Sequence, residues 1–382
     1  MAQAKINPQI IRWARQRLGL SLEETARRVG IREKPERLLA WENGEQYPTF
    51  RQAQELSKVL RIPFGYLFLS KAPQPIPPIA DFRTLPRDVL AKFSPELEDV
   101  LNDACRKRDW LRERRLQEGG QPLPFVARFS AQTPYGLICE DIRMTLNLPI
   151  PTAKNVKSHE EHLRYLVQQS EKAAIVVLQS GYVGSNTHRS LSVDEFRGFV
   201  LADPYAPIIF LNAKDAIHGR IFTLAHELAH LWTGTSGISN PQLGAGENQL
   251  EIERLCNQVA AELLVPAQVL KERWGTLNYL DLARDFCVSG LVILVRAYEM
   301  GLLERQEFQK LYAESKQKIK INSEYEKSST GGDFYRTFQV RNGRLLVSEA
   351  AQALREGSLL YREAAILLNA SPETLEKALE SL

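Results

Sequence analysis

Apolar residues at the start of the chain recur at helical spacing and are separated by short polar turns. Asn7 and Pro8 resemble a helix cap followed by a first-turn proline, and apolar positions then repeat every three or four residues. Further start signals follow at Ser21, Pro35 and Thr49. The pattern predicts a small all-helical domain over residues 1–71.

The pattern then changes twice. Four prolines fall within six residues of "KAPQPIPPIADF", which predicts a stiff linker over residues 72–94. A charged helix is expected at about 95–118, followed by three β-branched runs that predict a small three-stranded sheet: "AAIVVLQSG", "EFRGFVLAD" and "APIIFLN". Helical spacing returns from about 218 to 312. We therefore expect a mainly helical α+β protein whose second domain covers residues 95–312.

The last part of the chain is predicted to be helical again. A polar stretch ending in Gly-Gly indicates a second linker over residues 313–333. Three short helices are expected in 334–382, with Gly357 between the first two and Ser371 capping the last. This C-terminal module is either a small binding module or a cap on the preceding domain.

Composition adds limits to this picture. The chain has 382 residues, 44% of them hydrophobic and 25% charged, which is typical of globular proteins. No apolar run approaches the roughly 20 residues of a membrane helix, and the start lacks a signal-peptide core, so we expect a cytoplasmic protein. Four scattered cysteines favour reduced packing residues. Residues 1–72 hold 13 Lys/Arg against 7 Asp/Glu, so the basic charge lies there.

The segment "GRIFTLAHELAHLWTG" at 219–234 carries the main chemical signal. His226 and His230 are four residues apart, so a helix presents both on one face with Glu227 beside them. The other positions are apolar nearly all round, which predicts a buried helix. Because buried ionisable groups are costly unless paired or metal-bound, chance placement is the weaker interpretation.

A catalytic zinc usually has three protein ligands. The next apolar-periodic helix, "QLEIERLCNQVAAELLVP", places Glu253 and Asn257 on one face. We predict Glu253 as third ligand and Asn257 as a hydrogen-bond partner that orients a histidine. Glu251 points to another face and Glu262 lies nearly three turns on, so both are weaker candidates.

These residues predict zinc-peptidase chemistry. Zn2+ would acidify a water and polarise the scissile carbonyl, and Glu227 would carry the proton to the leaving amine. Arg220 and His218 lie just ahead of the site and are candidates for stabilising the oxyanion, although a solvated helix start is the favoured interpretation of both.

Most of the chain resembles the ImmA/IrrE family of bacterial metallopeptidases. The resemblance lies in "FTLAHELAHLWTGTSG", "ERLCNQVAAELLVP", "FRGFVLADPYAPIIFLN" and "IADFRTLP". It implies a gluzincin-like zinc endopeptidase with His226, His230 and Glu253 as ligands and Glu227 as base. It also implies a protein substrate, since characterised relatives cleave a helix-turn-helix repressor and thereby switch on genes.

The N-terminal segment resembles the Cro/repressor helix-turn-helix through "RQRLGLSLEETARRVGI" and the residues after it. Two features differ from that pattern. The turn "IREK" is about two residues longer, and the recognition-helix positions hold few base-reading residues. Arg37 is a good donor to a base edge, whereas Leu39 and Ala40 suit a protein partner better. DNA binding and protein binding both remain open for this domain.

Two other features have ordinary interpretations. "HEEH" at 159–162 predicts a solvated helix surface, and the basic stretch Arg106–Arg115 predicts an exposed, salt-bridged helix.

Two functions of different class remain. The first is a zinc endopeptidase that regulates transcription by cleaving a repressor or similar partner. The second is a non-catalytic DNA-binding or antitoxin-like regulator of a toxin-antitoxin operon, with a structural or vestigial zinc site. No membrane partner is expected, and a dimer is an open alternative.

Overall fold

The computed structural model describes residues 3–31, 34–72, 93–150, 158–239, 247–325 and 334–380. These residues form two compact units. The first contains the described residues up to 72 together with 93–99, and the second contains those from 100 onward. None of the described helices is both long and apolar enough to cross a membrane. Most of the linker predicted at 72–94 lies outside the described residues.

The first unit is helical, as the sequence predicts. Asn7 accepts a hydrogen bond from the backbone N–H of Gln9, Ser21 accepts one from Glu24, and Thr49 forms a capping box with Gln52. Its helices are α1 (Pro8–Arg17), α2 (Leu22–Val29), α3 (Pro35–Asn43), α4 (Phe50–Val59) and the short 3-10 helix η1 (Phe64–Phe68). Its core is formed by buried side chains that include Ile10, Ile11, Leu38, Trp41, Leu56 and Leu67.

The outward face of α3 carries the three predicted contact residues. Arg37 is exposed and its guanidinium lies 5.8 Å from the ring centroid of Trp41. Leu39 is 41% exposed and Ala40 is half-buried. In the preceding turn, Arg32 and Glu33 lie outside the described residues, so the length of that turn stays a prediction.

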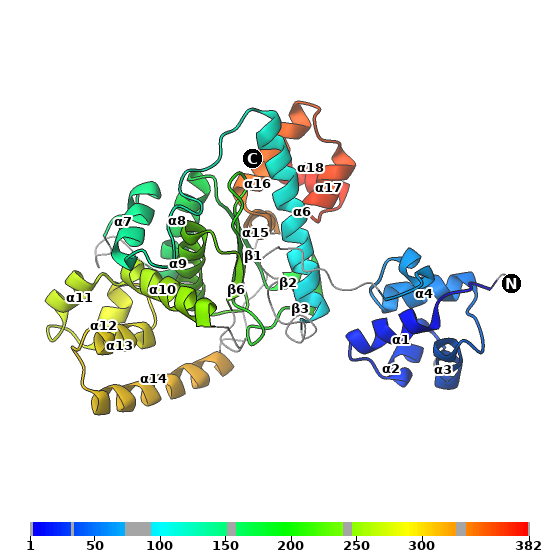
Figure 1. Ribbon diagram of the computed structural model, residues 1–382, viewed down its shortest axis with the longest axis horizontal. Coiled ribbons are helices and arrows are strands. Elements are labelled where there is room, and N and C mark those ends of the chain that lie inside the picture. Colours follow the sequence, from blue (N-terminus) through cyan, green and yellow to red (C-terminus); the bar gives the residue numbers. More distant parts are fainter. Residues whose placement is uncertain are drawn as a thin grey trace. The chain divides into compact units, whose positions relative to one another are not determined.

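The second unit is built on a mixed sheet (Figure 1). The strand order is β1-β5-β4-β6, with β1 parallel to β5 and β4 antiparallel to both of its neighbours. The three predicted strands are β1, β4 and β5, and the short strand β6 adds a fourth. The strands are β1 (Val176–Ser180), β4 (Gly198–Leu201), β5 (Ile208–Asn212) and β6 (Gly237–Ser239), with a separate hairpin of β2 (Tyr182–Val183) and β3 (Asn186–Ser190).

Helices surround this sheet. The long charged helix is α6 (Pro95–Gln117), close to its predicted bounds. Helix α14 runs to Tyr325, so the first part of the predicted second linker is helical. This difference follows from composition, because Glu, Lys and Gln are good helix formers even without an apolar face. The remaining helices are α7 (Tyr135–Thr145), α8 (His159–Lys172), α9 (Ile217–Thr233), α10 (Glu247–Leu264), α11 (Ala267–Arg273), α12 (Tyr279–Asp285), α13 (Gly290–Glu299) and α14 (Arg305–Tyr325).

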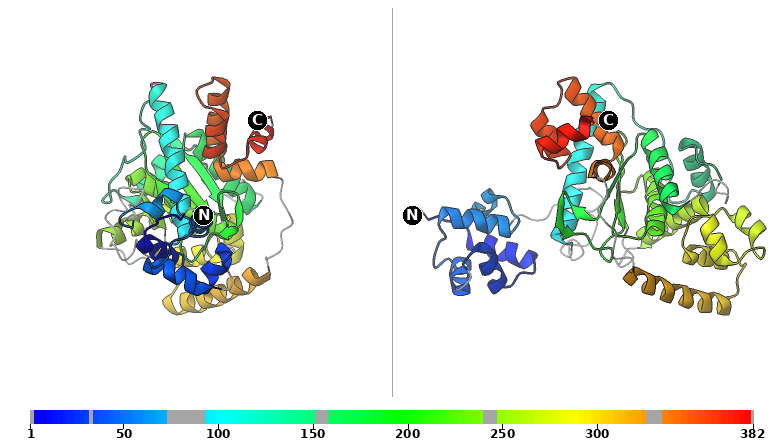
Figure 2. Two further views of the ribbon diagram at one scale, coloured as in Figure 1. Left: turned by 90° about the vertical axis from the view of Figure 1, so that its right-hand side faces the viewer. Right: turned by 180° about the vertical axis from the view of Figure 1, so that it is seen from behind.

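The C-terminal helices pack on the same unit. The residues described between 334 and 380 form four helices, one more than predicted, because a helix precedes Gly343. Gly343 is close to β1: a methyl group there would lie 3.0 Å from Val176 Cγ1. Figure 2 shows these helices next to α6, where Arg114 pairs with Glu349 of α16 and with Glu356, which caps the end of α16. They are α15 (Phe334–Asn342), α16 (Arg344–Arg355), α17 (Tyr361–Leu367) and α18 (Pro372–Glu380).

Two surface predictions need correction. His162 of "HEEH" is only 6% exposed, because its side of α8 faces the core. The basic stretch of α6 is salt-bridged as expected, but it is not fully exposed. Lys107 is 2% exposed beside Asp103, and Arg114 is 8% exposed. The four cysteines are free and buried.

Candidate metal centre

Helix α9 lies at the centre of the second unit. From Leu224 to Trp232 every side chain is buried, so the helix is enclosed on all sides. Trp232 stacks on Phe125 with ring centroids 4.5 Å apart, and its indole N–H donates to Asp141 Oδ1 at 2.7 Å. The helix ends at Gly234, whose φ of 71° forms a left-handed cap. This packing holds the polar residues of α9 in fixed positions.

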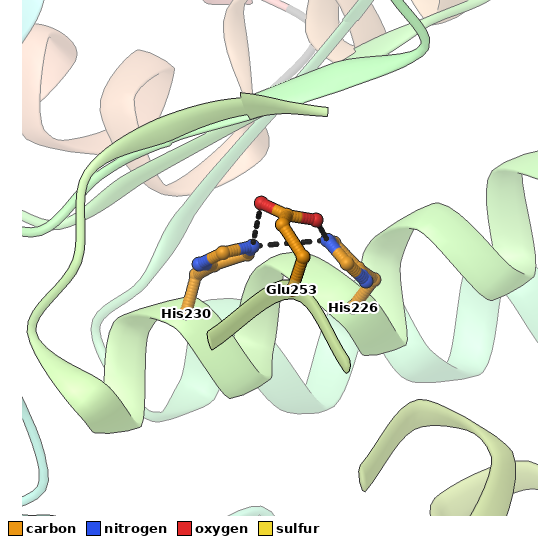
Figure 3. Close-up of side chains that lie close together, drawn as sticks. All are labelled: His226, His230 and Glu253. Atoms are coloured by element: carbon orange, nitrogen blue, oxygen red, sulfur yellow. Dashed lines mark hydrogen bonds and ion pairs between the residues drawn. The ribbon is translucent and has the colours of Figure 1, made fainter. Parts of the chain in front are cut away.

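Three side chains of α9 and α10 converge (Figure 3). The Nε2 atoms of His226 and His230 are 2.9 Å apart. The carboxylate of Glu253 lies over both, with Oε2 3.3 Å from His226 Nε2 and Oε1 3.2 Å from His230 Nε2. In the part of the chain that the structure describes, this is the one group of three or more His, Cys, Asp or Glu side chains close enough to hold a metal ion.

Each histidine has a partner on its other ring nitrogen. His226 Nδ1 lies 3.1 Å from Asn257 Oδ1, one turn beyond Glu253 on α10. His230 Nδ1 lies 2.8 Å from Thr235 Oγ1. Thr235 was not among the site residues predicted from the sequence. The available signal was Gly234, because a left-handed cap reverses the chain and returns the next residue to the last turn of the helix.

These two contacts favour imidazole tautomers that can bind a cation. An amide oxygen can only accept, so Asn257 Oδ1 requires the proton of His226 on Nδ1. The Thr235 hydroxyl can accept in the same way, since the His230 carbonyl and Thr233 offer it acceptors. Both Nε2 atoms then present lone pairs to each other and to a carboxylate. Two imidazole nitrogens and one carboxylate are a common ligand set for catalytic zinc.

Burial and mutual contact set the pKa values of this group. When the histidines are protonated on Nε2 as well, they donate to Glu253; burial opposes ionisation of Glu253, but these bonds outweigh it and lower the pKa far below the ordinary value. For His230, burial and the charge of His226 lower the pKa. Burial acts the same way on His226, but its bond with Glu253 and the charge of Glu227 raise its pKa overall. Glu253 is therefore ionised, which a ligand carboxylate requires.

Glu227 is fully buried on α9, between the two histidines in sequence. It lies against β4 at Gly198, where a methyl group would be 3.3 Å from Glu227 Oε1 and 2.5 Å from Thr223 Cγ2. The absence of a side chain at Gly198 thus allows α9 to approach the sheet beside this carboxylate. A carboxylate held next to two histidines can accept and return a proton.

The weaker candidates lie elsewhere. Glu251 is exposed. Glu262 pairs with Arg296 of α13. Arg220 lines a different cavity, between α8, β1 and α15, which none of the three convergent side chains lines. The His218 ring packs edge-on against His159 at 6.3 Å between centroids.

Comparison with known families agrees with this geometry. Residues 174–298 match the peptidase M78 family model, described as the IrrE N-terminal-like domain. This matched region, called the M78 domain below, contains the sheet strands β1, β4, β5 and β6 together with α9, α10 and nearly all of α13, and therefore all three convergent side chains. Residues 11–67 match a helix-turn-helix family model. The resemblance predicted from sequence is confirmed for both parts, while no curated protein matches the chain.

The M78 match supports a metallopeptidase-type enzyme, and together with the helix-turn-helix match it supports a protease-linked regulator with a domain of the DNA-binding class. Within the M78 domain, the triad of candidate ligands and the buried Glu227 are the groups that could take part in a reaction. The contact residues of α3 belong to the helix-turn-helix unit and are separate in sequence from this site.

Proposed function

We propose that the protein is a zinc-dependent endopeptidase that regulates transcription by cleaving a helix-turn-helix repressor or a similar regulatory partner. The observation that supports it best is the convergence of His226, His230 and Glu253 beside the buried Glu227. The metal is proposed to be Zn2+, because two histidines and a glutamate suit tetrahedral zinc and leave one position for water or substrate.

When bound, zinc would lower the pKa of a water molecule and polarise the carbonyl of the scissile bond. The protein's own residues then have distinct roles. Glu227 takes the proton of the water on a carboxylate oxygen and delivers it to the leaving amine. Asn257 and Thr235 hold the two imidazoles with their Nε2 lone pairs toward the ion, at 3.1 and 2.8 Å from the opposite nitrogens.

The regulatory part of the proposal rests on the joining of two domains in one chain. A helix-turn-helix next to a peptidase can direct cleavage to a partner or to a site on DNA. On α3, Arg37 and Leu39 are both exposed. The exposed leucine favours a protein partner, while the basic charge of the segment also suits phosphates.

A substitution at Glu227 tests the enzymatic part. Glu227→Gln keeps the shape of the side chain but cannot accept a proton as a carboxylate does. We expect the variant to contain one zinc ion per chain, as the parent protein does, measured by elemental analysis. Its cleavage of a quenched fluorescent peptide mixture should fall by at least about a hundredfold, the typical contribution of general-base catalysis.

Glu251→Gln is the matched control, because Glu251 is an exposed glutamate of α10. It should retain both zinc and activity. A Glu227→Gln protein that cleaves as fast as the parent would contradict the assigned role. A parent protein that binds zinc yet cleaves neither peptides nor any helix-turn-helix repressor would instead support a non-catalytic, antitoxin-like regulator.

A further inference from the structure

A cavity of about 520 Å³ lies next to the candidate metal centre. It is bounded by residues of α9, α10, α13 and α14. Two of its lining residues connect it to the site: Asn257 is bonded to His226, and Phe222 precedes His226 by one helical turn. The cavity is therefore one residue contact away from His226, on the side of its Nδ1 atom.

Much of the cavity wall is apolar. Phe222 contributes from α9, and Leu291, Val292 and Val295 contribute from α13. All four are only partly buried or exposed, although they belong to an otherwise well-packed domain. Such a wall suits the methylene groups of a side chain, because contact with it removes apolar surface from water.

Arg296 provides an unusual polar group in the same cavity. Its side chain is 5% exposed, and one terminal nitrogen pairs with Glu262. The Nε–H of this guanidinium is buried and donates to no residue that the structure describes. Buried N–H groups are nearly always hydrogen-bonded, so an unpaired donor on a residue that lines a cavity favours a ligand that brings an acceptor.

The other polar groups of the cavity also favour an acceptor. Asn257 uses its oxygen for His226, and within the described ranges its amide nitrogen has no acceptor. Arg254, likewise without an ion pair to any described side chain, adds a second guanidinium. Among the described lining residues Glu299 is the one acidic side chain, and Glu262 outside the lining already pairs with Arg296. The guanidinium of Arg254 and the amide N–H of Asn257 are the donors that remain without an acceptor among the described residues.

We propose that this cavity binds a carboxylate of the substrate, namely the side chain of a glutamate close to the scissile bond. A glutamate matches both parts of the lining, since its methylene groups contact the apolar wall and its oxygens only accept hydrogen bonds. This inference rests on the proposed peptidase function and adds the substrate class to it. Arg254 and Arg296 are then specificity-determining residues of the reaction.

Peptide pools test the preference. The pools are quenched fluorescent peptides of random sequence with one position fixed as Glu or as Gln. We expect the zinc-loaded protein to cleave the Glu pool with a kcat/KM at least about tenfold higher than the Gln pool, as expected for a charge-assisted hydrogen bond. In Arg254→Glu the ratio should fall to about one, because the substitution reverses the charge in the cavity.

Two further variants keep this test interpretable. Arg284→Glu makes the same change at an exposed arginine of α12 outside the cavity lining and should leave the ratio unchanged. Arg296→Lys retains a charge for Glu262 but lacks the Nε–H, so the Glu preference should weaken while thermal unfolding shows a folded protein. Equal cleavage of both pools by the parent protein would overturn the inference and leave the peptidase function intact.

A binding measurement separates the inference from the peptidase function. Glu227→Gln protein is titrated with fluorescein-labelled Glu and Gln pools, each as free acid and as C-terminal amide, and anisotropy is recorded. Tighter binding of the Glu pool that survives amidation and disappears with Arg254→Glu supports the inference, even if no peptide is cleaved. Binding that depends on the free C-terminus and ignores the fixed position assigns the carboxylate to a chain end, and overturns the side-chain proposal.

Discussion

At the scale of single residues, burial decides which polar side chains take part in chemistry. Glu227 and His162 each have histidine or acidic neighbours in the sequence, and both side chains are buried. Glu227 lies between two histidines that share a third ligand-type residue. Both ring nitrogens of His162 are buried without a hydrogen bond to any described residue. A histidine in this position is costly when charged, so it is expected to affect stability.

His162 makes a testable contribution to acid sensitivity. Burial, with a smaller effect of the His159 charge, lowers its pKa to about 4. Because the folded pKa lies below the unfolded one, the unfolded chain binds the proton first as the pH falls. Stability present above about pH 6.5 is thus lost toward pH 4, by on the order of 1–3 kcal/mol.

Denaturant unfolding across this pH range measures the effect. We expect His162→Leu to lose less stability between neutral and acidic pH than the parent protein. His188→Leu, at an exposed position of β3, should follow the parent curve. Parallel curves for His162→Leu and the parent would show that this histidine is not the acid-sensitive group.

At the scale of elements, the site depends on the contact between α9 and the sheet. Gly198 of β4 faces Thr223 and Glu227 of α9, and β6 pairs with β4 along the same strand. The sequence predicted α9, α10 and three of the sheet strands from their apolar periods. No feature of the sequence indicated that a glycine of one strand would set the distance to α9.

Gly198→Ala tests this contact. The added methyl group would lie 2.5 Å from Thr223 Cγ2 and 2.8 Å from the Phe210 carbonyl oxygen, so α9 or the strand must shift. We expect the free energy of unfolding to fall by about 1–3 kcal/mol, the usual cost of overpacking. Gly136→Ala is the control, because nothing lies within 4 Å of a methyl group there. An equal effect of the two substitutions would disprove the tight contact.

At the scale of the molecule, the C-terminal helices belong to the peptidase unit. Arg114 of α6 is 8% exposed, with Nε 3.2 Å from Glu349 and Nη1 3.1 Å from Glu356. Helix α15 packs against β1, where Gly343 permits a close approach. Of the two roles open from sequence, a cap on the preceding domain agrees with these contacts.

Replacing Arg114 should loosen that cap. In Arg114→Met, Glu349 and Glu356 lose their shared cation, and we expect a loss of about 1–3 kcal/mol, less than for fully buried pairs because both acids are partly exposed. Thermal unfolding and protease sensitivity of α15–α18 measure it. Arg112→Met removes a more exposed arginine that pairs with Asp203 and should cost under about 1 kcal/mol. Similar losses in both variants would count against a specific role for Arg114.

The sequence by itself determined most of the local elements and the candidate ligand set. Period, caps and turn residues are local properties, so most of the helices, the strands β1, β4 and β5, and the candidate triad of His226, His230 and Glu253 could be predicted from it. Tertiary structure decided what depends on packing between distant segments. Thr235 reaches His230 only because the chain reverses at Gly234. The cavity lined by Arg296, whose Nε–H has no partner among the described residues, forms only where α9, α10, α13 and α14 meet.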